Sequence, residues 1–320
     1  MRYTFVLALV LVAGCSDSPT APTASPVVSG GGLAAVGSTR SNDSPTDYVI
    51  SGRVSATNGG EALGGLDVSI PGYAPVKTSA DGSFRLPVAS RSATYAVGIS
   101  GPSVLPRTLR LAVTGSQAAA LDAIVQGGPF DLAFYRQLVR GGYERPNSLA
   151  RLGHFAQPPR IYLRTIDDRG AAIDPVTLDQ TAAVLINAAG EMTGRFGLAG
   201  LEMGTSSRVG QSGWLTVRWS SEASRLCGYA DIGVEGGSLD LFTSASSCGC
   251  GRYRIAPRVV KHELGHALGF YHTDSVNDIM WGGTWPSSQC EMGMSAREKY
   301  HAAIAYSRPN GNVDPDIDPQ

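Results

Sequence analysis

The chain has 320 residues, of which 42% are hydrophobic and 17% are charged, a globular composition with room for two ordinary domains and tails. Its 26 basic and 27 acidic residues give a formal net charge of −1, which excludes an electrostatic basis for binding nucleic acid or an anionic membrane surface. The 40 glycines and 19 prolines favour short strands and long loops over a helical bundle.

Residues 1–14 have the pattern of an export signal. Arg2 is followed by an apolar run that is too short to span a bilayer stably. The run ends in Val12-Ala13-Gly14-Cys15, which resembles the lipobox of bacterial lipoproteins and implies that Cys15 is lipidated and becomes the new N-terminus. Ser16 after this cysteine is similar to lipoproteins sent to the Gram-negative outer membrane. We therefore expect an extracytoplasmic lipoprotein at the outer membrane or cell surface, touching the membrane through its lipid. An ordinary signal peptide with an incidental cysteine is the alternative.

The next two segments are a tether and a β domain. Residues 15–47 are rich in Ser, Pro, Thr and Gly and cannot bury enough apolar surface to fold. Residues 48–126 contain short alternating runs with a hairpin signal at Asp81-Gly82, which predicts a small all-β sandwich. The stretch 50–88 resembles the carboxypeptidase regulatory-like family of seven-stranded sandwiches, accessory modules that stand beside enzymes. A spacer without a ligand and a specific binding module both fit this stretch.

A helix and the start of a second domain follow. Residues 127–157 are interpreted as a linker helix and loop, because 131–141 place apolar residues at helical spacing. We place the second domain at 158–308. It opens with an alternating strand at 160–165 and then a helix, whose Asp174-Pro175 start fits an N-cap followed by proline at the first helical position.

The rest of the second domain combines strands with a last helix. Residues 215–219 and 238–242 are strand candidates, and Ser295 to Glu298 form a capping box that opens a helix through about Ser307. Strands first and helices last predict an α+β domain. Residues 309–320 hold three aspartates and three prolines, which predicts a disordered acidic tail.

Four cysteines remain after Cys15: Cys227, Cys248, Cys250 and Cys290. An even set in an exported chain predicts two disulfides, and three pairings are open. A zinc site at Cys248-x-Cys250 is the alternative, although its spacing is shorter than that of zinc ribbons.

Three of the five histidines fall within eleven residues, at His262, His266 and His272. His262 and His266 stand four residues apart, which puts both imidazoles on one side of a helix, where they can bind one zinc ion. Gly269 permits the sharp turn that brings a third ligand, His272, back to the metal. Three ligands leave the fourth position open for water. Glu263 can take a proton from that water as it attacks a peptide carbonyl.

The sequence HELGHALGFYH at 262–272 resembles the metzincin signature HExxHxxGxxH and is most similar to the matrixin branch. The resemblance implies a metzincin-like zincin catalytic domain of the α+β class at 158–308, one catalytic Zn²⁺ and a polypeptide substrate. Met280 lies eight residues beyond His272 and resembles the Met-turn, which implies a structural floor and not a ligand. Two departures are Thr273, where matrixins usually have serine, and Gly282, where some relatives place a zinc-facing tyrosine.

The sequence thus predicts an extracytoplasmic zinc endopeptidase. One alternative is a catalytically silent, zinc-binding adhesion or ligand-binding lipoprotein, which would not need Glu263, and another is a hydrolase of non-protein substrates. Ca²⁺ occurs in related enzymes, but the chain has no compact acidic loop that would bind it. The other histidines, His154 and His301, are expected to be surface or packing residues.

Overall fold

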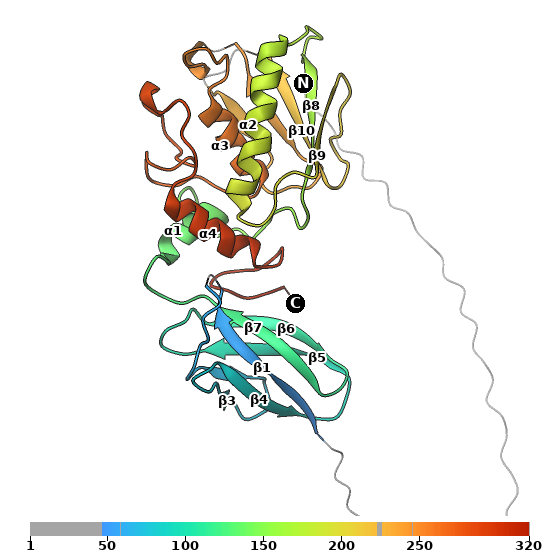
Figure 1. Cartoon of the computed structure of the whole chain (residues 1–320), viewed down its shortest axis with the longest axis vertical. Helices are drawn as coiled ribbons and strands as arrows, with labels where there is room; N and C mark the ends of the chain where they lie inside the picture. The colour runs from blue at the N-terminus through green and yellow to red at the C-terminus, as the bar shows by residue number, and fades with distance from the viewer. Residues whose placement is uncertain (1–46, 58, 223–225, 245, 320) are drawn as a thin grey trace, which may run out of the picture. The chain divides into compact units, whose positions relative to one another are not determined.

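A computed structural model of the chain describes residues 47–57, 59–222, 226–244 and 246–319, and Figure 1 shows their elements in chain order. The predicted signal peptide, Cys15 and the tether up to residue 46 lie outside the described residues. Of the described helices, none has both the length and the hydrophobicity that a membrane crossing requires.

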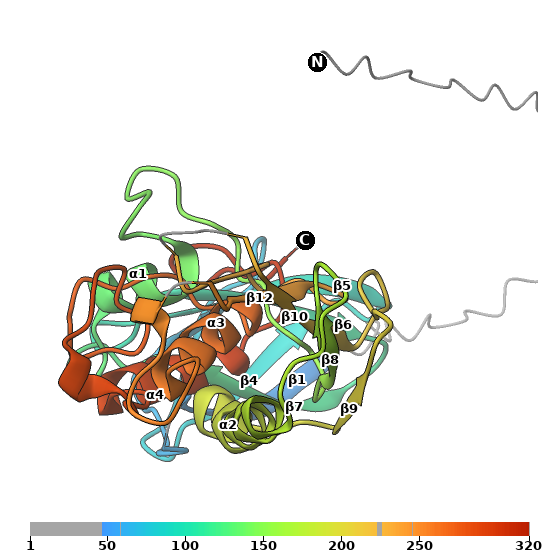
Figure 2. The ribbon, with the colours of Figure 1, turned by 90° about the horizontal axis from the view of Figure 1, so that it is seen from above.

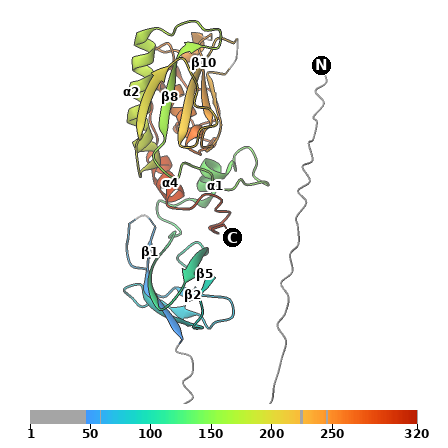
Figure 3. The same ribbon diagram turned by 90° about the vertical axis from the view of Figure 1, so that its right-hand side faces the viewer.

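Seven strands build the N-terminal module. They are β1 (Tyr48–Ala56), β2 (Asp67–Ser69), β3 (Val76–Lys77), β4 (Ser83–Val88), β5 (Ala93–Ser100), β6 (Arg107–Val113) and β7 (Gln117–Ala123). One sheet has the order β4-β1-β7 and the other β3-β2-β5-β6, and Figure 3 shows β1 and β5 in separate layers. Alternate side chains such as Ile50 and Val97 meet in a shared core between the sheets. Asp81-Gly82 forms a turn, but β3 and β4 on its two sides belong to different sheets, so the predicted hairpin is wrong.

The C-terminal module is built on a five-stranded sheet. Its strands are β8 (Arg160–Asp167), β9 (Gly200–Gly204), β10 (Trp214–Ser220), β11 (Gly228–Ala230) and β12 (Ser238–Phe242), in the order β11-β12-β10-β8-β9. Neighbouring strands are parallel except β11, which runs antiparallel to β12 at the edge. Inner strands carry fully buried pairs such as Leu215 and Val217, as expected for a sheet that is covered by other elements.

Helices pack against this sheet and against one another. They are α1 (Leu132–Arg140), α2 (Pro175–Thr193), α3 (Pro257–Ala267) and α4 (Ala296–Tyr306), with short 3₁₀ turns at Ser246–Cys248 and Ser287–Gln289. Figure 2 shows α2 and α3 on the same side of the sheet. The predicted starts are confirmed: Asp174 caps α2 ahead of Pro175, and Ser295 with Glu298 forms the capping box of α4.

The segment predicted as a linker is part of the C-terminal core. Helix α1 forms where expected, but Phe134, Tyr135 and Leu138 are buried in the same cluster as the sheet and α3. Phe134 also makes an edge-to-face contact with His301 of α4, at 4.9 Å between ring centroids. The linker prediction for 127–157 is therefore wrong, because the apolar face of α1 is covered by α4 and becomes core.

The predicted disordered tail is ordered over its described residues, 309–319. Asn312 and Asp316 are almost completely buried. The side chain of Arg140 donates to Asn312 Oδ1 over 2.6 Å, and Arg308 donates to Asp316 Oδ2 over 2.8 Å. The disorder prediction is wrong because it counted the polar residues of this segment as solvated, whereas they are the partners of buried arginines.

Two disulfides join Cys227 to Cys248 and Cys250 to Cys290. The alternative of a zinc site at Cys248-x-Cys250 is wrong, since both sulfurs are in disulfides. The bonds fix loops at the start of α3, where Ala256 N donates to Cys248 O at 2.7 Å and Arg258 N to Cys290 O at 3.1 Å. They thereby hold the end of α3 that precedes the histidine motif.

Candidate metal centre

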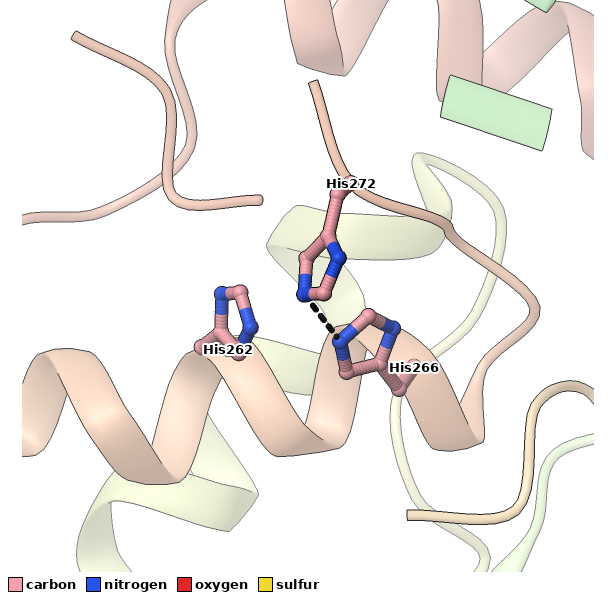
Figure 4. A group of neighbouring side chains, drawn as sticks. All are labelled: His262, His266 and His272. Carbon is pink, nitrogen blue, oxygen red and sulfur yellow. Dashed lines mark hydrogen bonds between the residues drawn. The ribbon is translucent and has the colours of Figure 1, made fainter. Parts of the chain in front are cut away.

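Three imidazoles converge where α3 meets the loop that follows it. His262 and His266 lie one turn apart on α3, with ring centroids 4.7 Å apart, and His272 comes from the loop (Figure 4). His266 Nε2 and His272 Nε2 are 3.1 Å apart, and the candidate ligand atoms of all three residues lie within 4.8 Å of one another. The structure thus brings together all three histidines that the sequence predicted as ligands, and this group can hold a metal ion.

The second nitrogen of each ring is already engaged by an oxygen. His262 Nδ1 lies 2.7 Å from Ile279 O, His266 Nδ1 lies 2.7 Å from Phe270 O, and His272 Nδ1 lies 2.5 Å from Glu144 Oε1. Because carbonyl and carboxylate oxygens accept hydrogen bonds, the protons belong on Nδ1 and the Nε2 lone pairs stay free. The outer partners thus present all three rings in the tautomer that binds a metal through Nε2.

The close Nε2 pair fits a metal. With both Nδ1 atoms protonated, His266 Nε2 and His272 Nε2 present two lone pairs 3.1 Å apart, a spacing that one shared cation suits. Two nitrogen ligands of a tetrahedral zinc, each at about 2.0–2.1 Å from the metal, stand about 3.3 Å apart. Burial also lowers the pKa of His262 well below its usual value and the pKa of His266 to about 4, which keeps both rings in the neutral form that binds metals.

Gly269 makes the turn that returns His272 to α3. Its φ of +107° lies in the region that favours glycine, and a Cβ at this position would stand 2.1 Å from Gly153 O. The backbone after the turn is held by hydrogen bonds, with Phe270 N donating to Gly265 O at 3.0 Å and Tyr271 N to Leu138 O at 2.7 Å. The predicted turn at Gly269 is therefore required both by conformation and by space.

Glu263 lies beside His262 and is 6% exposed. Burial raises the pKa of Glu263 to about 8, with a smaller contribution from the charge of Asp240. The edge strand β11 passes directly over this carboxylate, because a Cβ on Gly228 would lie 2.4 Å from Glu263 Cγ. A buried carboxyl group with this pKa can accept and release a proton near neutral pH.

Met280 is fully buried against α3. Its sulfur would lie 2.3 Å from a Cβ placed on Gly265, the residue before His266. The backbone around Met280 is fixed by Glu298, whose carboxylate accepts from Ile279 N at 3.0 Å and Met280 N at 2.9 Å. Ile279 O in turn faces His262 Nδ1, so the packing under α3 is tied to the orientation of the first candidate ligand.

The histidines and Glu263 line one cleft of about 560 Å³. Its walls are β11, the first turns of α3, the loop at 281–285 and the segment that carries Glu144. The cleft is large enough for part of an extended polymer, and its polar groups converge at the three imidazoles.

Comparison with known proteins gives weak similarities. No family model matches the chain, and no curated protein does either. Among solved structures, metalloproteinase-II from Bacteroides fragilis covers 79% of this chain and 84% of its own at 10% identity and a TM-score of 0.34.

Two further solved structures match about a quarter of the chain. A type II cohesin–X-dockerin complex from Acetivibrio cellulolyticus covers 26% of this chain at 19% identity and a TM-score of 0.22. A putative carbohydrate-binding protein from Bacteroides uniformis covers 25% at 20% identity and a TM-score of 0.21. The matches span 61% and 42% of those two chains, less than two thirds of each. These values specify no function for the chain.

Glu144 is the residue of the centre that sequence reasoning missed. It stands 128 positions before His272, in the segment interpreted as a linker, and no local pattern marks it. The remaining histidines pack as expected: His301 Nε2 accepts from Asp131 N at 2.9 Å, and both ring nitrogens of His154 lie 2.9 Å from backbone carbonyls. Neither takes part in the centre.

Proposed function

We propose that this chain is a zinc-dependent endopeptidase. The observation that carries the proposal is the convergence of three Nε2 atoms, from His262, His266 and His272, beside a buried carboxylate in one cleft. The donor set of three neutral imidazoles suits zinc, and three protein ligands are typical of catalytic sites that keep one position for water.

Zinc held by His262, His266 and His272 would supply a Lewis acid that lets water lose a proton near neutral pH. Glu263 accepts that proton as the water oxygen attacks the peptide carbonyl, and it then donates the proton to the leaving amine. Burial raises the pKa of Glu263 above its usual range, which makes its carboxylate a stronger proton acceptor. The neighbouring ring nitrogens, fixed by Ile279 O, Phe270 O and Glu144, keep the centre preorganised.

The edge strand β11 supports an extended polypeptide as substrate. Its other side pairs with β12, and its outer edge borders the cleft next to Glu263. An extended peptide can add to such an edge through main-chain hydrogen bonds, which places a peptide bond beside the carboxylate. We further propose that Cys15 anchors the protein by a lipid outside the cytoplasm, so that its substrates are extracytoplasmic proteins.

The test compares purified wild-type protein with the Glu263→Ala variant on casein and gelatin, with and without a chelator. Cleavage by wild type that a chelator abolishes and zinc restores, together with a loss of at least 100-fold in the variant, supports the proposal. Metal content is measured in both proteins. If both bind zinc and both are equally inert, the chain is a silent zinc-binding protein and the endopeptidase proposal is wrong.

A further inference from the structure

Arg258 is a buried cation in the wall of the cleft. It lies in the first turn of α3, four residues before His262, and it is 7% exposed. The indole of Trp285 lies between the two residues: its ring is 5.8 Å from the Arg258 guanidinium carbon and 5.0 Å from the His262 ring, by centroid. Four residues of helix rise about 6 Å, so the Arg258 backbone stands about one turn before that of His262.

The buried guanidinium of Arg258 has few hydrogen-bond acceptors and no counter-charge around it among the described residues. Arg258 Nη1 donates to Pro286 O at 2.8 Å, whereas Nε is buried without a partner. Burial lowers the pKa of Arg258, and no described carboxylate forms an ion pair with it. Removing a cation from water without a counter-charge is costly, so such a group is normally paired.

The other three buried arginines of the described chain have more partners, although Arg107 Nε and Arg140 Nε are also buried without one. Arg107 and Arg308 form ion pairs with aspartates, and Arg140 donates to both the side chain and the backbone of Asn312. Of these four residues, only Arg258 lines the cleft. Arg140 also has no carboxylate partner but donates to three oxygens, so the buried arginine with the fewest acceptors is the one where a substrate would lie.

We propose that Arg258 selects polypeptides with an acidic side chain next to the cleaved bond, an inference that rests on the proposed endopeptidase function. A substrate carboxylate would supply the missing counter-charge at a guanidinium that is held in place by Trp285 and Pro286. The two described carboxylates of the cleft do not serve this purpose, because Glu144 accepts from His272 and Glu263 stands beside His262 at the catalytic position.

We expect a preference for glutamate of the size that a charge-assisted hydrogen bond to a buried guanidinium gives. A glutamine has the shape of glutamate without its charge, so it cannot compensate the guanidinium. We expect glutamate to be favoured over glutamine by about tenfold in kcat/KM at one position beside the scissile bond, and over lysine by more.

The experiment uses matched peptides that carry Glu, Gln or Lys at each position flanking the cleaved bond. Arg258→Gln should abolish the preference for glutamate, Arg258→Glu should reverse it in favour of lysine, and Arg258→Lys should keep its sign. Thermal melting of each variant verifies folding, and the lysine variant keeps both the charge and the apolar stem of the side chain. Arg145→Gln is the matched control, because Arg145 is the other described arginine of the cleft, is exposed and should not set the preference.

A binding measurement separates this proposal from the proposed function. Fluorescence anisotropy with labelled peptides and the Glu263→Ala protein needs no turnover, and the glutamate peptide should bind about tenfold more tightly than its glutamine counterpart. Efficient cleavage without selection for an acid, or a preference that follows Arg145, overturns the role of Arg258 while proteolysis stands. If no peptide is cleaved by wild type, proteolysis fails, and equal binding of the two peptides then refutes the acidic selection as well.

Discussion

His272 differs from the other candidate ligands in what orients its ring. The Nδ1 atoms of His262 and His266 face backbone carbonyls, whereas that of His272 faces the Glu144 side chain at 2.5 Å. Glu144→Ala should therefore free the ring of the loop ligand and weaken zinc binding by about 10- to 100-fold. Competition with a chromophoric zinc chelator measures this affinity.

A matched control for Glu144 is Glu235→Ala, which removes an exposed carboxylate that accepts from Ser212 and does not line the cleft. Its zinc affinity should equal that of wild type. Equal affinities for the Glu144→Ala protein and wild type would show that the orientation of His272 does not depend on this carboxylate.

The buried carboxyl group of Glu298 should make the stability of the protein depend on pH. Burial raises the pKa of Glu298 to about 7, against three backbone N–H groups that favour the charged carboxylate. The folded state then binds more protons than the unfolded state between about pH 4.5 and 7, so the stability that this group contributes is present at low pH and is lost as pH rises through 7. The free energy of unfolding of wild type relative to Glu298→Gln should fall by about 3 kcal/mol from pH 4.5 to pH 8.

This difference is measured by urea unfolding of both proteins in chelator, so that metal binding does not contribute. Glutamine does not titrate, and the histidines and Glu263 are common to both proteins, so their titration cancels. A difference that stays constant over this pH range would contradict the raised pKa of Glu298.

At the residue scale, the sequence was sufficient to predict which histidines come together but not which residues orient them. The spacing of His262 and His266 and the glycine at 269 follow from helix geometry and turn chemistry, so the candidate ligands could be predicted from local pattern. Glu144 and Arg258 could not be predicted from local pattern. The role of Glu144 depends on a contact across 128 residues, and that of Arg258 depends on the shortage of hydrogen-bond partners around its buried guanidinium.

At the scale of elements, helix α3 can pack closely against Met280 because Gly265 has no Cβ. A Cβ on Gly265 would lie 2.3 Å from the Met280 sulfur. Gly265→Ala should therefore destabilise the protein by about 1–3 kcal/mol through overpacking, although alanine is the better helix former. Chemical denaturation measures the change.

Gly190→Ala in α2 is the opposite case and serves as the control. The nearest atom to a Cβ there is 3.8 Å away, so alanine meets ordinary contacts and should stabilise by about 0.5–1 kcal/mol. If Gly265→Ala stabilised the protein as well, the close packing of Met280 beneath the metal centre would be refuted.

Local sequence patterns predicted where helices begin better than they predicted which strands pair. The caps at Asp174 and Ser295 and the apolar spacing of 131–141 located three helices, because these signals act within one turn. The pairing of β3 and β4 with different sheets, and the mostly parallel order of the C-terminal sheet, depend on long-range packing that no local pattern encodes.

At the scale of the whole molecule, the last eleven described residues connect distant parts of the chain. Asn312 O accepts from Leu152 N at 2.9 Å, and Asn312 Oδ1 accepts from Arg140 of α1. Arg308 is fully buried and pairs with Asp316 and with Asp122 of β7. These contacts extend to the candidate metal centre, because Gly153, next to Leu152, packs against the Gly269 turn.

Deleting residues 309–320 should therefore destabilise the protein, because buried Arg140 loses Asn312 and buried Arg308 loses Asp316 and keeps Asp122 as its remaining carboxylate partner. We expect the free energy of unfolding to fall by about 3–5 kcal/mol, the cost of breaking a buried pair from one side. Urea unfolding of the truncated and full chains measures it, with deletion of 319–320 as a control that keeps Asn312 and Asp316. If this segment were disordered, both deletions would leave the free energy of unfolding unchanged. A loss of stability in the longer deletion alone would show that the segment is held by its contacts despite its polar composition.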